Sequence, residues 1–410
     1  MNCRHCGSAV ALPFLDLGSA PPSNAYLAAD ALSVPETWFP LKVLVCEICW
    51  LVQTQDHAGR EQLFTHDYAY FSSTSSSWLA HAKRYAQATT AEFNLGPDSF
   101  VVEIASNDGY LLQYFAAFGI HVLGVEPTAS TAAQARAKGI AVEEVFFGVE
   151  EARRLRAAYR PATLMAANNV LAHVPDIDDF LGGFRELLAA DGVATFEFPH
   201  LAELIANTQF DTVYHEHYSY LSLVAVERIA RLNGMVVFRV EQLPTHGGSL
   251  RVYLQHASGP HAIESSVADT LAAERATGLN RADTYAGFQA AAERVKDDLV
   301  AFLIAAKRDG RSVAAYGAAA KGNTLLNFAG IRPDLIAFVV DRAAAKQGRY
   351  MPGSRIPILA PEVLAVNKPD IVLILPWNIA AEVMAEQAGI AAWGGRFWVA
   401  VPQLREVALA

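Results

Sequence analysis

The sequence contains few charged residues and no region in which positive charge is concentrated. Asp, Glu, Lys and Arg make up 18% of the 410 residues, and the formal net charge is −10. A nucleic acid or an anionic membrane binds to a dense patch of Lys and Arg, and the sequence has no such run. We therefore expect neither partner, and enzymes that act on nucleic acids are disfavoured.

Long hydrophobic runs are also missing. No apolar stretch approaches the roughly 20 residues that a membrane-spanning helix needs, and the residues after Met1 lack the basic and then apolar pattern of a secretion signal. We therefore expect a cytoplasmic protein. Low-complexity segments and short repeats are absent too, and 52% of the residues are hydrophobic. Such a chain forms packed cores, and its length predicts two or three domains.

Cysteine is scarce, and its four residues fall into two Cys-x-x-Cys pairs, Cys3 with Cys6 and Cys46 with Cys49. A Cys-x-x-Cys turn presents two thiolates on one side, and Zn²⁺ prefers four tetrahedral ligands, so the pairs predict a structural zinc site. Four thiolates leave no position open for water, which gives the metal a role in folding. We do not expect His5 to be a ligand. The alternative is a pair of buried or redox-active dithiols.

Four segments differ in composition and periodicity. Residues 1–67 hold all the cysteines and little helical pattern, and we interpret them as a zinc-binding domain. Residues 68–262 form the central domain, 263–308 a helical connector and 309–410 a second α/β domain. The central domain opens with a Ser-rich turn and an apolar helical pattern, which predicts a lead-in helix.

Short β-branched runs alternate with helical patterns in both larger domains, as expected for parallel sheets covered by helices on both faces. The predicted strands of the central domain are 100–104, 122–126, 163–166 and 193–198, and its predicted helices are 111–118, 129–138 and 178–188. In the last domain the predicted strands are 312–317, 336–341 and 371–376, with a helix over 323–328. The fold class is therefore α/β: a small zinc-binding N-terminal module, a central doubly wound Rossmann-like domain and a second Rossmann-like domain at the C-terminus.

An acidic residue ends each of the first two predicted strands of the central domain. Glu103 precedes the small-residue turn Ala105-Ser106-Asn107-Asp108-Gly109, and Glu126 precedes Pro127. The positively charged S-adenosylmethionine (SAM) suits such a turn, whereas Asp108 would repel the pyrophosphate of a dinucleotide. Glu126 stands where a ribose-binding carboxylate is expected. We predict a SAM site here; the alternative is an ordinary turn with two solvated acids.

The turn departs from the usual pattern at two positions. SAM enzymes of this kind commonly carry glycine where this chain has Ala105 and Asn107. Asn tolerates left-handed geometry better than other non-glycine residues, and Ala has the smallest side chain with a Cβ atom, so the turn remains feasible.

The segment Tyr214-His215-Glu216-His217-Tyr218 is the densest group of chemically active side chains in the sequence. Methylating a carbon requires a base that removes a proton next to a carbonyl group, and histidine titrates near neutrality. A zinc-protease motif is excluded because only one residue separates His215 from His217. On a strand Tyr214, Glu216 and Tyr218 would share a face, whereas a helix or turn would group the side chains differently. The alternative is an aromatic edge strand with incidental histidines.

Several motifs in one order resemble the sugar C-methyltransferases that act on dTDP-linked 3-amino-4-keto-deoxyhexoses and make branched sugars such as tetronitrose. The resemblance runs over the full length of the chain, and motifs in a fixed order are more specific than any one of them. Its carriers are the two Cys-x-x-Cys pairs, Glu103–Gly109 (EIASNDG), Asn168–His173 (NNVLAH), Tyr214–His217 (YHEH), Thr245–Arg251 (THGGSLR) and Tyr316–Asn323 (YGAAAKGN).

The resemblance implies that a nucleotide-linked 4-keto-deoxysugar binds in the cleft and is methylated at C3. By this analogy His217 is the general base, Tyr214 and Glu216 lie beside it, and Tyr68 and His173 line the same pocket. The resulting enolate attacks the SAM methyl group. The implied cofactor-binding residues are Glu103, Ala105, Asn107, Asp108, Gly109, Glu126, Pro127 and Asn168. The implied substrate-binding residues are Asn169, His246, Lys321 and Asn323.

The turn Tyr316–Asn323 is suited to hold a diphosphate through backbone N–H groups and the Lys321 ammonium. The alternative is a small-residue packing turn with a solvated lysine, and Asp341, Lys346 and Trp377-Asn378 are further candidates. Two other functions stay open at this level. One is SAM-dependent methylation of another small molecule at oxygen or nitrogen, and the other is a non-catalytic, zinc-stapled scaffold that binds a nucleotide.

Overall fold

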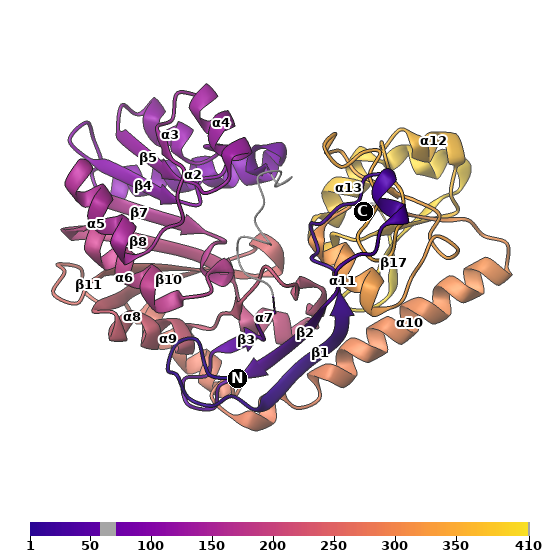
Figure 1. Cartoon of the computed structure of the whole chain (residues 1–410), viewed down its shortest axis with the longest axis horizontal. Helices are drawn as coiled ribbons and strands as arrows, with labels where there is room; N and C mark the ends of the chain where they lie inside the picture. Colours follow the sequence, from indigo (N-terminus) through magenta and orange to yellow (C-terminus); the bar gives the residue numbers. More distant parts are fainter. Residues whose placement is uncertain (58–70, 409–410) are drawn as a thin grey trace.

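Three β-sheets organise the part of the chain that the structure describes. The computed structural model describes residues 1–57 and 71–408. Figure 1 shows one α/β body built from the middle of the chain and another built from its C-terminal part. The strands β1 (Leu12–Ala20) and β2 (Phe39–Val45) and the long helix α10 (Phe288–Arg308) run along the lower side of that view. These elements connect the two bodies.

The N-terminal sheet joins residues that lie far apart in the sequence. Its order is β1-β2-β3-β9, with all neighbours antiparallel, where β3 is Val52–Thr54 and β9 is Ser219–Tyr220. Leu and Val residues of β2 are buried against α10 and the C-terminal body. Val52 pairs with Tyr220 and Gln53 with Ser219, so the cysteine-bearing module and the central domain share one sheet.

The central sheet has seven strands in the order β10-β11-β8-β7-β4-β5-β6. The five strands from β4 to β8 are parallel, while β11 is antiparallel to β8 and β10 to β11. Every residue of β4 is buried, as expected for a parallel strand covered on both faces. The sheet is therefore mixed, not wholly parallel as predicted, because a final hairpin closes its edge. The strands are β4 (Phe100–Ile104), β5 (His121–Val125), β6 (Val142–Glu143), β7 (Ala162–Asn168), β8 (Leu188–Pro199), β10 (Met235–Leu243) and β11 (Ser249–His256).

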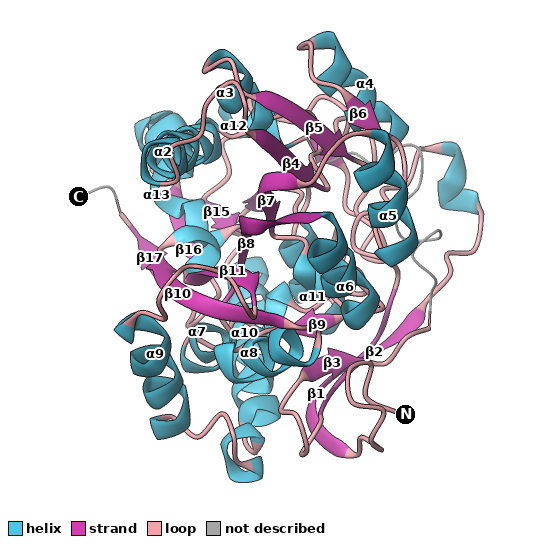
Figure 2. Cartoon of the chain, turned by 90° about the vertical axis from the view of Figure 1, so that its left-hand side faces the viewer, coloured by secondary structure: helices cyan, strands magenta, loops and turns pink. Residues whose placement is uncertain are grey.

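Helices cover both faces of this sheet (Figure 2). Val101 of β4 packs in a buried cluster with α2, α3 and α4, whereas its neighbour Val102 packs with α5, α6 and α8. Successive strand residues point to opposite faces, so the sheet lies between two helical layers. Ser75 begins α2, the predicted lead-in helix, by accepting a hydrogen bond from the Trp78 amide at 3.2 Å. The helices are α2 (Ser76–Glu92), α3 (Leu112–Ala117), α4 (Ala129–Ala137), α5 (Val149–Ala158), α6 (Ile177–Leu187), α7 (Leu201–Ala206) and α8 (Leu223–Leu232).

The C-terminal sheet has six strands in the order β14-β13-β12-β15-β16-β17, and only β17 is antiparallel to its neighbour. Counted along the chain, this is the order 3-2-1-4-5-6, which reverses direction between β12 and β15. The predicted α/β class with two Rossmann-like sheets is confirmed. The strands are β12 (Val313–Tyr316), β13 (Val339–Val340), β14 (Ile358–Leu359), β15 (Ile371–Ile374), β16 (Arg396–Val399) and β17 (Arg405–Val407). The remaining helices are α9 (Ser265–Ala276), α11 (Ala320–Phe328), α12 (Val363–Asn367) and α13 (Ala380–Glu386). Among the helices of the described residues, none combines the length and apolar character needed to cross a membrane.

Candidate active site and metal site

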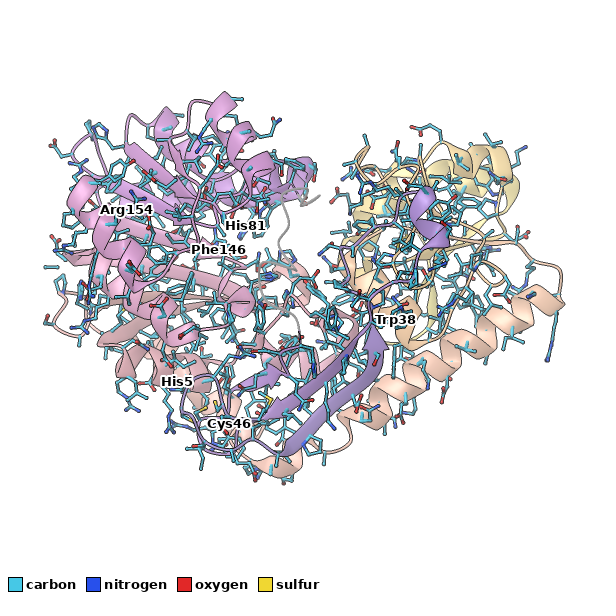
Figure 3. The ribbon with its side chains drawn as sticks, in the orientation of Figure 1. His5, Trp38, Cys46, His81, Phe146 and Arg154 are labelled. Atoms are coloured by element: carbon cyan, nitrogen blue, oxygen red, sulfur yellow. The ribbon has the colours of Figure 1, made fainter. Side chains whose placement is uncertain are left out.

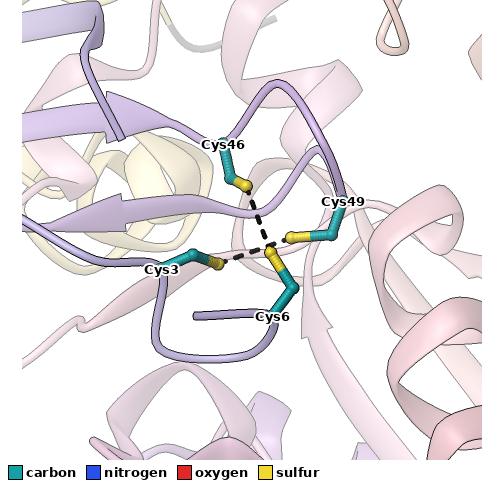
Figure 4. Close-up of side chains that lie close together, drawn as sticks. All are labelled: Cys3, Cys6, Cys46 and Cys49. Atoms are coloured by element: carbon teal, nitrogen blue, oxygen red, sulfur yellow. Dashed lines mark hydrogen bonds between the residues drawn. The ribbon is translucent and has the colours of Figure 1, made fainter. Parts of the chain in front are cut away.

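The four cysteine sulfurs converge from two turns (Figure 4). Cys3 and Cys6 precede β1, and Cys46 and Cys49 lie on the turn between β2 and β3. The Sγ atoms all lie within 4.8 Å of one another, and the Cys3–Cys49 and Cys6–Cys46 distances are both 3.5 Å. Four thiolates at about 2.3 Å from a tetrahedral Zn²⁺ ion stand about 3.8 Å apart. The quartet therefore fits zinc, with each cysteine supplying one thiolate.

His5 docks this metal module on the central domain. Its Nδ1 lies 2.9 Å from Oδ1 of Asp178 on α6, and the Asn233 side chain donates to the same oxygen at 2.7 Å. In Figure 3, His5 and Cys46 lie close together at the lower side of the central body. The contact with Asp178 accounts for His5 without a role as a metal ligand.

The turn after β4 contains residues with left-handed backbone dihedrals, a conformation that is uncommon for residues other than glycine. Ala105 has φ 54°, Asn107 has φ 50° and Gly109 has φ 75°. A Cβ atom in this region costs about 1–2 kcal/mol, which is why glycine is common there. The Asn107 side chain offsets part of this cost, because its Oδ1 accepts the amides of Ser72 at 2.9 Å and Asp108 at 3.0 Å. The turn therefore forms despite its two non-glycine residues.

Glu126 fixes the same turn against the end of β5. Its Oε2 accepts the Asn107 amide and its Oε1 the Thr128 amide, both at 2.9 Å. Burial raises the pKa of Glu126, and the Thr128 and Asn107 bonds oppose that rise. Pro127 lies in the bend that leads to α4. A buried carboxylate at the end of the second strand is the group that holds ribose hydroxyls in nucleotide-binding sheets.

Glu103 is a buried acid at the carboxyl end of β4. Its carboxylate oxygens and Oδ1 of Asn168 on the adjacent β7 have no partner in good hydrogen-bond geometry among the described residues, although the nearby Tyr110 hydroxyl and Leu112 amide lower the pKa of Glu103. Burial raises the pKa of Glu103 well above its usual range, and the charges of Asp108 and Glu126 act in the same direction. Lys138 approaches Asp108 to 3.4 Å. A buried carboxylate without a cation beside it is costly to ionise, and the ammonium group of SAM would supply that charge.

The segment Tyr214–Tyr218 forms a tight turn and not a strand. The His217 amide donates to the Tyr214 carbonyl at 2.9 Å, between the short 3-10 helix η4 (Phe210–Thr212) and β9. The turn brings the Tyr214 and His217 rings to a centroid distance of 3.9 Å, and His173 from η3 (Leu171–His173) lies 4.6 Å from His217. His215 points elsewhere, toward a carbonyl of β2 at 3.2 Å. Tyr214, His173 and His217 therefore form one cluster.

His217 carries its proton on Nδ1. This atom donates to the Thr212 carbonyl at 2.9 Å, and a carbonyl oxygen can only accept. Burial lowers the pKa of His217 well below its usual range, and the nearby His173 and Lys321 lower it further. The ring is therefore neutral near pH 7 and presents the lone pair of Nε2, which is the form that a general base needs.

Two neighbours of His217 also have shifted pKa values. Nδ1 of His173 donates to the Glu216 carbonyl at 2.8 Å, and burial lowers the pKa of His173 to about 4. Burial raises the pKa of Glu216, whose Oε1 accepts from the Asn24 side chain at 3.1 Å. Four of the predicted catalytic residues thus lie around one turn. The fifth, Tyr68, lies outside the described residues.

Asn169 and His246 lie side by side. Nδ2 of Asn169 donates to Nε2 of His246 at 3.1 Å, and both residues have left-handed backbone, with φ 57° and 55°. Burial lowers the pKa of His246 to about 4, which keeps Nε2 an acceptor. The His246 ring, on η5 (Thr245–Gly247), also packs against Trp78 of α2 with centroids 5.2 Å apart. Strained backbone of this kind is concentrated at functional sites.

Lys321 and Asp211 both contact Trp377 at the boundary between the two α/β bodies. Lys321, on α11, lies 4.6 Å from the Trp377 ring centroid and donates to Asn378 at 2.9 Å. The Trp377 indole, on η7 (Trp377–Ile379), donates to Oδ2 of Asp211 at 2.8 Å. Burial raises the pKa of Asp211 to about 6 and lowers the pKa of Lys321, and each charge partly opposes the shift of the other. A buried ammonium in this position is suited to an anionic ligand.

The N-terminal segment Ser23–Tyr26 contacts both bodies. Asn24 binds Glu216, as described above, and the Tyr26 hydroxyl donates to the Ala318 carbonyl at 2.5 Å. The Asn323 side chain donates to the Ser23 carbonyl at 2.6 Å. Asn323 is therefore bound to the protein backbone, whereas Lys321, two residues earlier, contacts Trp377 and Asn378.

Asp341 ties the turn after β12 to the end of β13. Its Oδ2 accepts the Ala318 amide and its Oδ1 the Ala343 amide, both at 2.8 Å. Lys346 approaches Asp341 to 3.6 Å and donates to the Ala318 carbonyl at 2.7 Å. The turn that begins at Gly317 is held by these contacts at the carboxyl end of the C-terminal sheet.

Comparison with known proteins assigns this arrangement to a family. Residues 3–64 match a zinc binding domain, 78–240 a methyltransferase domain and 244–402 a C-methyltransferase C-terminal domain. The C-methyltransferase NovU of Streptomyces niveus is 36% identical over 406 residues, which cover 99% of this chain and 96% of NovU. The chain belongs to the C-methyltransferase family. It is a SAM-dependent methyltransferase with an N-terminal zinc site, as the sequence predicted.

Two solved methyltransferases match less than half of this C-methyltransferase. Magnesium protoporphyrin IX methyltransferase from Synechocystis PCC 6803 with bound SAH is 14% identical, covers 43% of this chain and 82% of its own, and has a TM-score of 0.35. The CcbJ methyltransferase from Streptomyces caelestis is also 14% identical, covers 43% of this chain and 89% of its own, and has a TM-score of 0.34.

One buried acid of the C-methyltransferase was not singled out in the sequence. Glu197, at the end of β8, binds three side chains: His81 at 2.8 Å, Arg251 at 2.8 Å and Thr245 at 2.9 Å. Burial raises its pKa, but the His81 bond and the Arg251 charge prevail and bring the pKa to about 2. Figure 3 shows His81 on the side of the central body that faces the C-terminal body. Through these bonds Glu197 holds α2 beside η5. In the sequence, this role was indicated by an acidic residue within the apolar run 193–198.

Proposed function

We propose that this C-methyltransferase methylates C3 of a nucleotide-linked 4-keto-deoxysugar, with His217 as the general base. One observation carries the proposal: the His217 ring is buried and neutral, and it donates through Nδ1 to Thr212, so that Nε2 is presented as a base. A carbon next to a ketone becomes a nucleophile only after it loses a proton, which is the task that such a base performs.

The proposed reaction follows from this geometry. Nε2 of His217 takes the C3 proton, and the electron pair of the broken C–H bond passes into an enolate over C3, C4 and O4. C3 then forms a bond to the methyl carbon while the bond from that carbon to sulfur breaks, and the sulfur keeps the electron pair. When bound, SAM supplies this electrophilic methyl group. Glu103 and Asn168 would hold its ammonium group and Glu126 its ribose, with the turn Ala105–Gly109 around it.

The sugar nucleotide is proposed to bind at the C-terminal sheet. Ligands of open α/β sheets bind where the strand order reverses, which here is between β12 and β15. The turns that follow these two strands carry Lys321 and the pair Trp377-Asn378. The Lys321 ammonium would contact the diphosphate, and Asn169 and His246 the sugar. The neighbouring Asn323, bound to Ser23, would support this turn.

An exchange experiment tests the proposal. In D₂O without SAM, the enzyme should exchange the C3 hydrogen of dTDP-4-keto-6-deoxyglucose faster than buffer does, and this is measured by proton NMR. With SAM, a methyl group should replace the C3 hydrogen, so the product should gain the mass of CH2 and lose the C3 hydrogen signal. A methylated product that keeps its C3 hydrogen would mean that oxygen or nitrogen is the acceptor, and the proposal would be wrong.

A further inference from the structure

Gln53 and Thr54, which we name the Gln53–Thr54 bridge, connect the metal site to the segment that carries His217. The Gln53 side chain is fully buried and donates through Nε2 to Sγ of Cys3 at 3.2 Å. Its Oε1 accepts the amide of Arg4, which lies between Cys3 and Cys6, at 2.9 Å. Hydrogen bonds of this kind fix the orientation of a metal-binding thiolate. A displacement of the turn that holds Cys3 and Cys6 would therefore displace Gln53 as well.

Thr54 holds the backbone at the general base. Its amide donates to the Tyr218 carbonyl at 3.1 Å, and its hydroxyl donates to the His217 carbonyl at 3.1 Å. Thr54 is 2% exposed. Loss of its hydroxyl would therefore cost free energy, because water cannot easily take its place as the donor. These bonds continue the pairing of β3 with β9 beyond Ser219, so that Thr54 contacts Tyr218 and His217.

Arg4 strengthens the same connection from the first cysteine turn. Its Nη2 donates to the Thr54 carbonyl at 3.1 Å, and its guanidinium lies 5.2 Å from the ring centroid of Tyr218. Both cysteine pairs are thus tied to the backbone after His217, since the Cys46–Cys49 turn leads directly into β3.

We propose that the zinc-binding module positions the general base in addition to stabilising the fold, with Thr54 as the positioning residue. The proposal rests on the base role of His217. The Thr212 carbonyl anchors the His217 ring, and two contacts anchor its backbone, the Tyr214 carbonyl at the amide and the Thr54 hydroxyl at the carbonyl. With these contacts in place, Nε2 has one orientation toward the substrate carbon. A misplacement of about 1 Å in a catalytic group can cost on the order of 100-fold in rate.

A purely structural role for Thr54 makes a different prediction from a positioning role. If Thr54 only stabilises the fold, its loss lowers the melting temperature, but the folded enzyme keeps its kcat. If Thr54 positions His217, kcat falls in the folded, zinc-loaded enzyme while SAM binding is unaffected. The proposed SAM residues lie on the turn after β4 and at the carboxyl ends of β4, β5 and β7, and neither Gln53 nor Thr54 contacts them through a hydrogen bond among the described residues.

The test compares Thr54→Val, Thr54→Ser and Thr89→Val in the full-length, zinc-loaded protein. Thr89 is a matched control, because it is 1% exposed and its hydroxyl also donates to a backbone carbonyl, that of Tyr85 at 2.8 Å, at a distant position on α2. The measurements are kcat and KM with SAM and dTDP-4-keto-6-deoxyglucose, the zinc content, and deuterium uptake by peptides covering residues 212–220.

Thr54→Val is expected to lower kcat at least tenfold, with the KM for SAM within twofold of wild type and one zinc per chain. Peptides over 212–220 should take up deuterium faster than in wild type. Thr54→Ser restores the hydroxyl and should recover most of the rate, while Thr89→Val should keep the wild-type kcat. A wild-type kcat in Thr54→Val would overturn the proposal, as would equal losses in Thr54→Ser or Thr89→Val.

Two further variants separate the possible failures. If His217→Asn keeps its turnover, the base assignment itself fails; if His217→Asn is inactive and Thr54→Val is normal, only the positioning proposal fails. If Thr54→Val does not fold, the variant Gln53→Met tests the proposal instead, at the end of the Gln53–Thr54 bridge that contacts the metal site. It preserves the side-chain volume and removes the bond to Cys3, and a normal kcat with bound zinc would overturn the proposal.

Discussion

Glu126 and Asp341 make the same pair of hydrogen bonds in two different sheets. Glu126 accepts hydrogen bonds from the Asn107 amide, in the turn after β4, and from the Thr128 amide. Asp341 accepts them from the Ala318 amide, in the turn after β12, and from the Ala343 amide. Each acid directly follows a strand, β5 or β13, that pairs with the first strand of its sheet along the chain, β4 or β12. The turns after β4 and β12 are thus held by an acidic residue in the same way.

His217→Asn should lower kcat by about 10²–10⁴-fold, the range that a general base contributes. SAM affinity, measured by calorimetry, should stay within twofold, because the SAM residues lie elsewhere. His215→Asn is the matched control, since that ring bonds to a β2 carbonyl and not to the cluster. Normal turnover in His217→Asn would remove the residue from the base role.

The acidic limb of the kcat/KM profile should have its midpoint below pH 6.5. Burial and the nearby His173 lower the pKa of His217, so its base form persists to a lower pH than that of an exposed histidine. The rate should therefore be nearly constant from pH 8 to about pH 6.5. Circular dichroism at each pH separates loss of base from unfolding, and a midpoint above 6.5 in a folded enzyme would contradict the assignment.

Lys321→Met should raise the KM for the nucleotide-sugar at least tenfold and leave SAM affinity unchanged. The substitution keeps the contact with Trp377 but removes the ammonium proposed to bind the diphosphate. Lys296→Met is a suitable control, because Lys296 also lies over an aromatic ring, that of Phe328 at 5.2 Å, on helix α10. Equal effects of the two variants would rule out a specific contact by Lys321.

Ala105→Gly should stabilise the protein by up to about 1 kcal/mol. Glycine relieves the left-handed strain at φ 54° but loses more entropy on folding, so the net gain is smaller than the strain itself. Urea unfolding followed by fluorescence measures the change. Ala132→Gly in α4, where the backbone is helical, should instead destabilise the protein by about 1 kcal/mol. A loss of stability in Ala105→Gly would show that its methyl group is needed for packing.

Cys46→Ser should lose the metal and the ordered N-terminal module. The serine cannot complete the thiolate quartet, and metal binding and folding are coupled in such sites. Zinc is measured with a chromogenic chelator and order by limited proteolysis. His5→Asn should keep one zinc per chain, because His5 contacts Asp178 and not the metal position. A fully active, zinc-free Cys46→Ser protein would disprove the metal site.

The sequence predicted the elements that depend on local pattern. The strand 100–104 and its following helix, the lead-in helix and the convergence of the four cysteines all follow from hydrophobic periodicity or ligand spacing. The two acids Glu103 and Glu126 were found for the same reason, because each ends a clear strand. Local rules are sufficient where the neighbours in space are also neighbours along the chain.

The arrangement of the catalytic segment depends on long-range contacts and could not be read from the sequence. Whether Tyr214 and His217 share a side was undecided, and a single backbone bond between them makes the turn that settles it. The two-residue strand β9 is too short to show a period, and it exists because β3, more than 160 residues earlier, pairs with it. Glu197 was missed because its partners come from three separate elements.

The segment Ser23–Tyr26 gives this enzyme a late step of assembly. Tyr26 and Ser23 are separated from their partners Ala318 and Asn323 by 292 and 300 residues. At about 5–20 residues per second, a ribosome needs roughly 15–60 s to make that length of chain. Asn24 and its partner Glu216, 192 residues apart, are both synthesised before Ala318 and Asn323. A chain that ends before Ala318 therefore lacks the partners of both Tyr26 and Ser23.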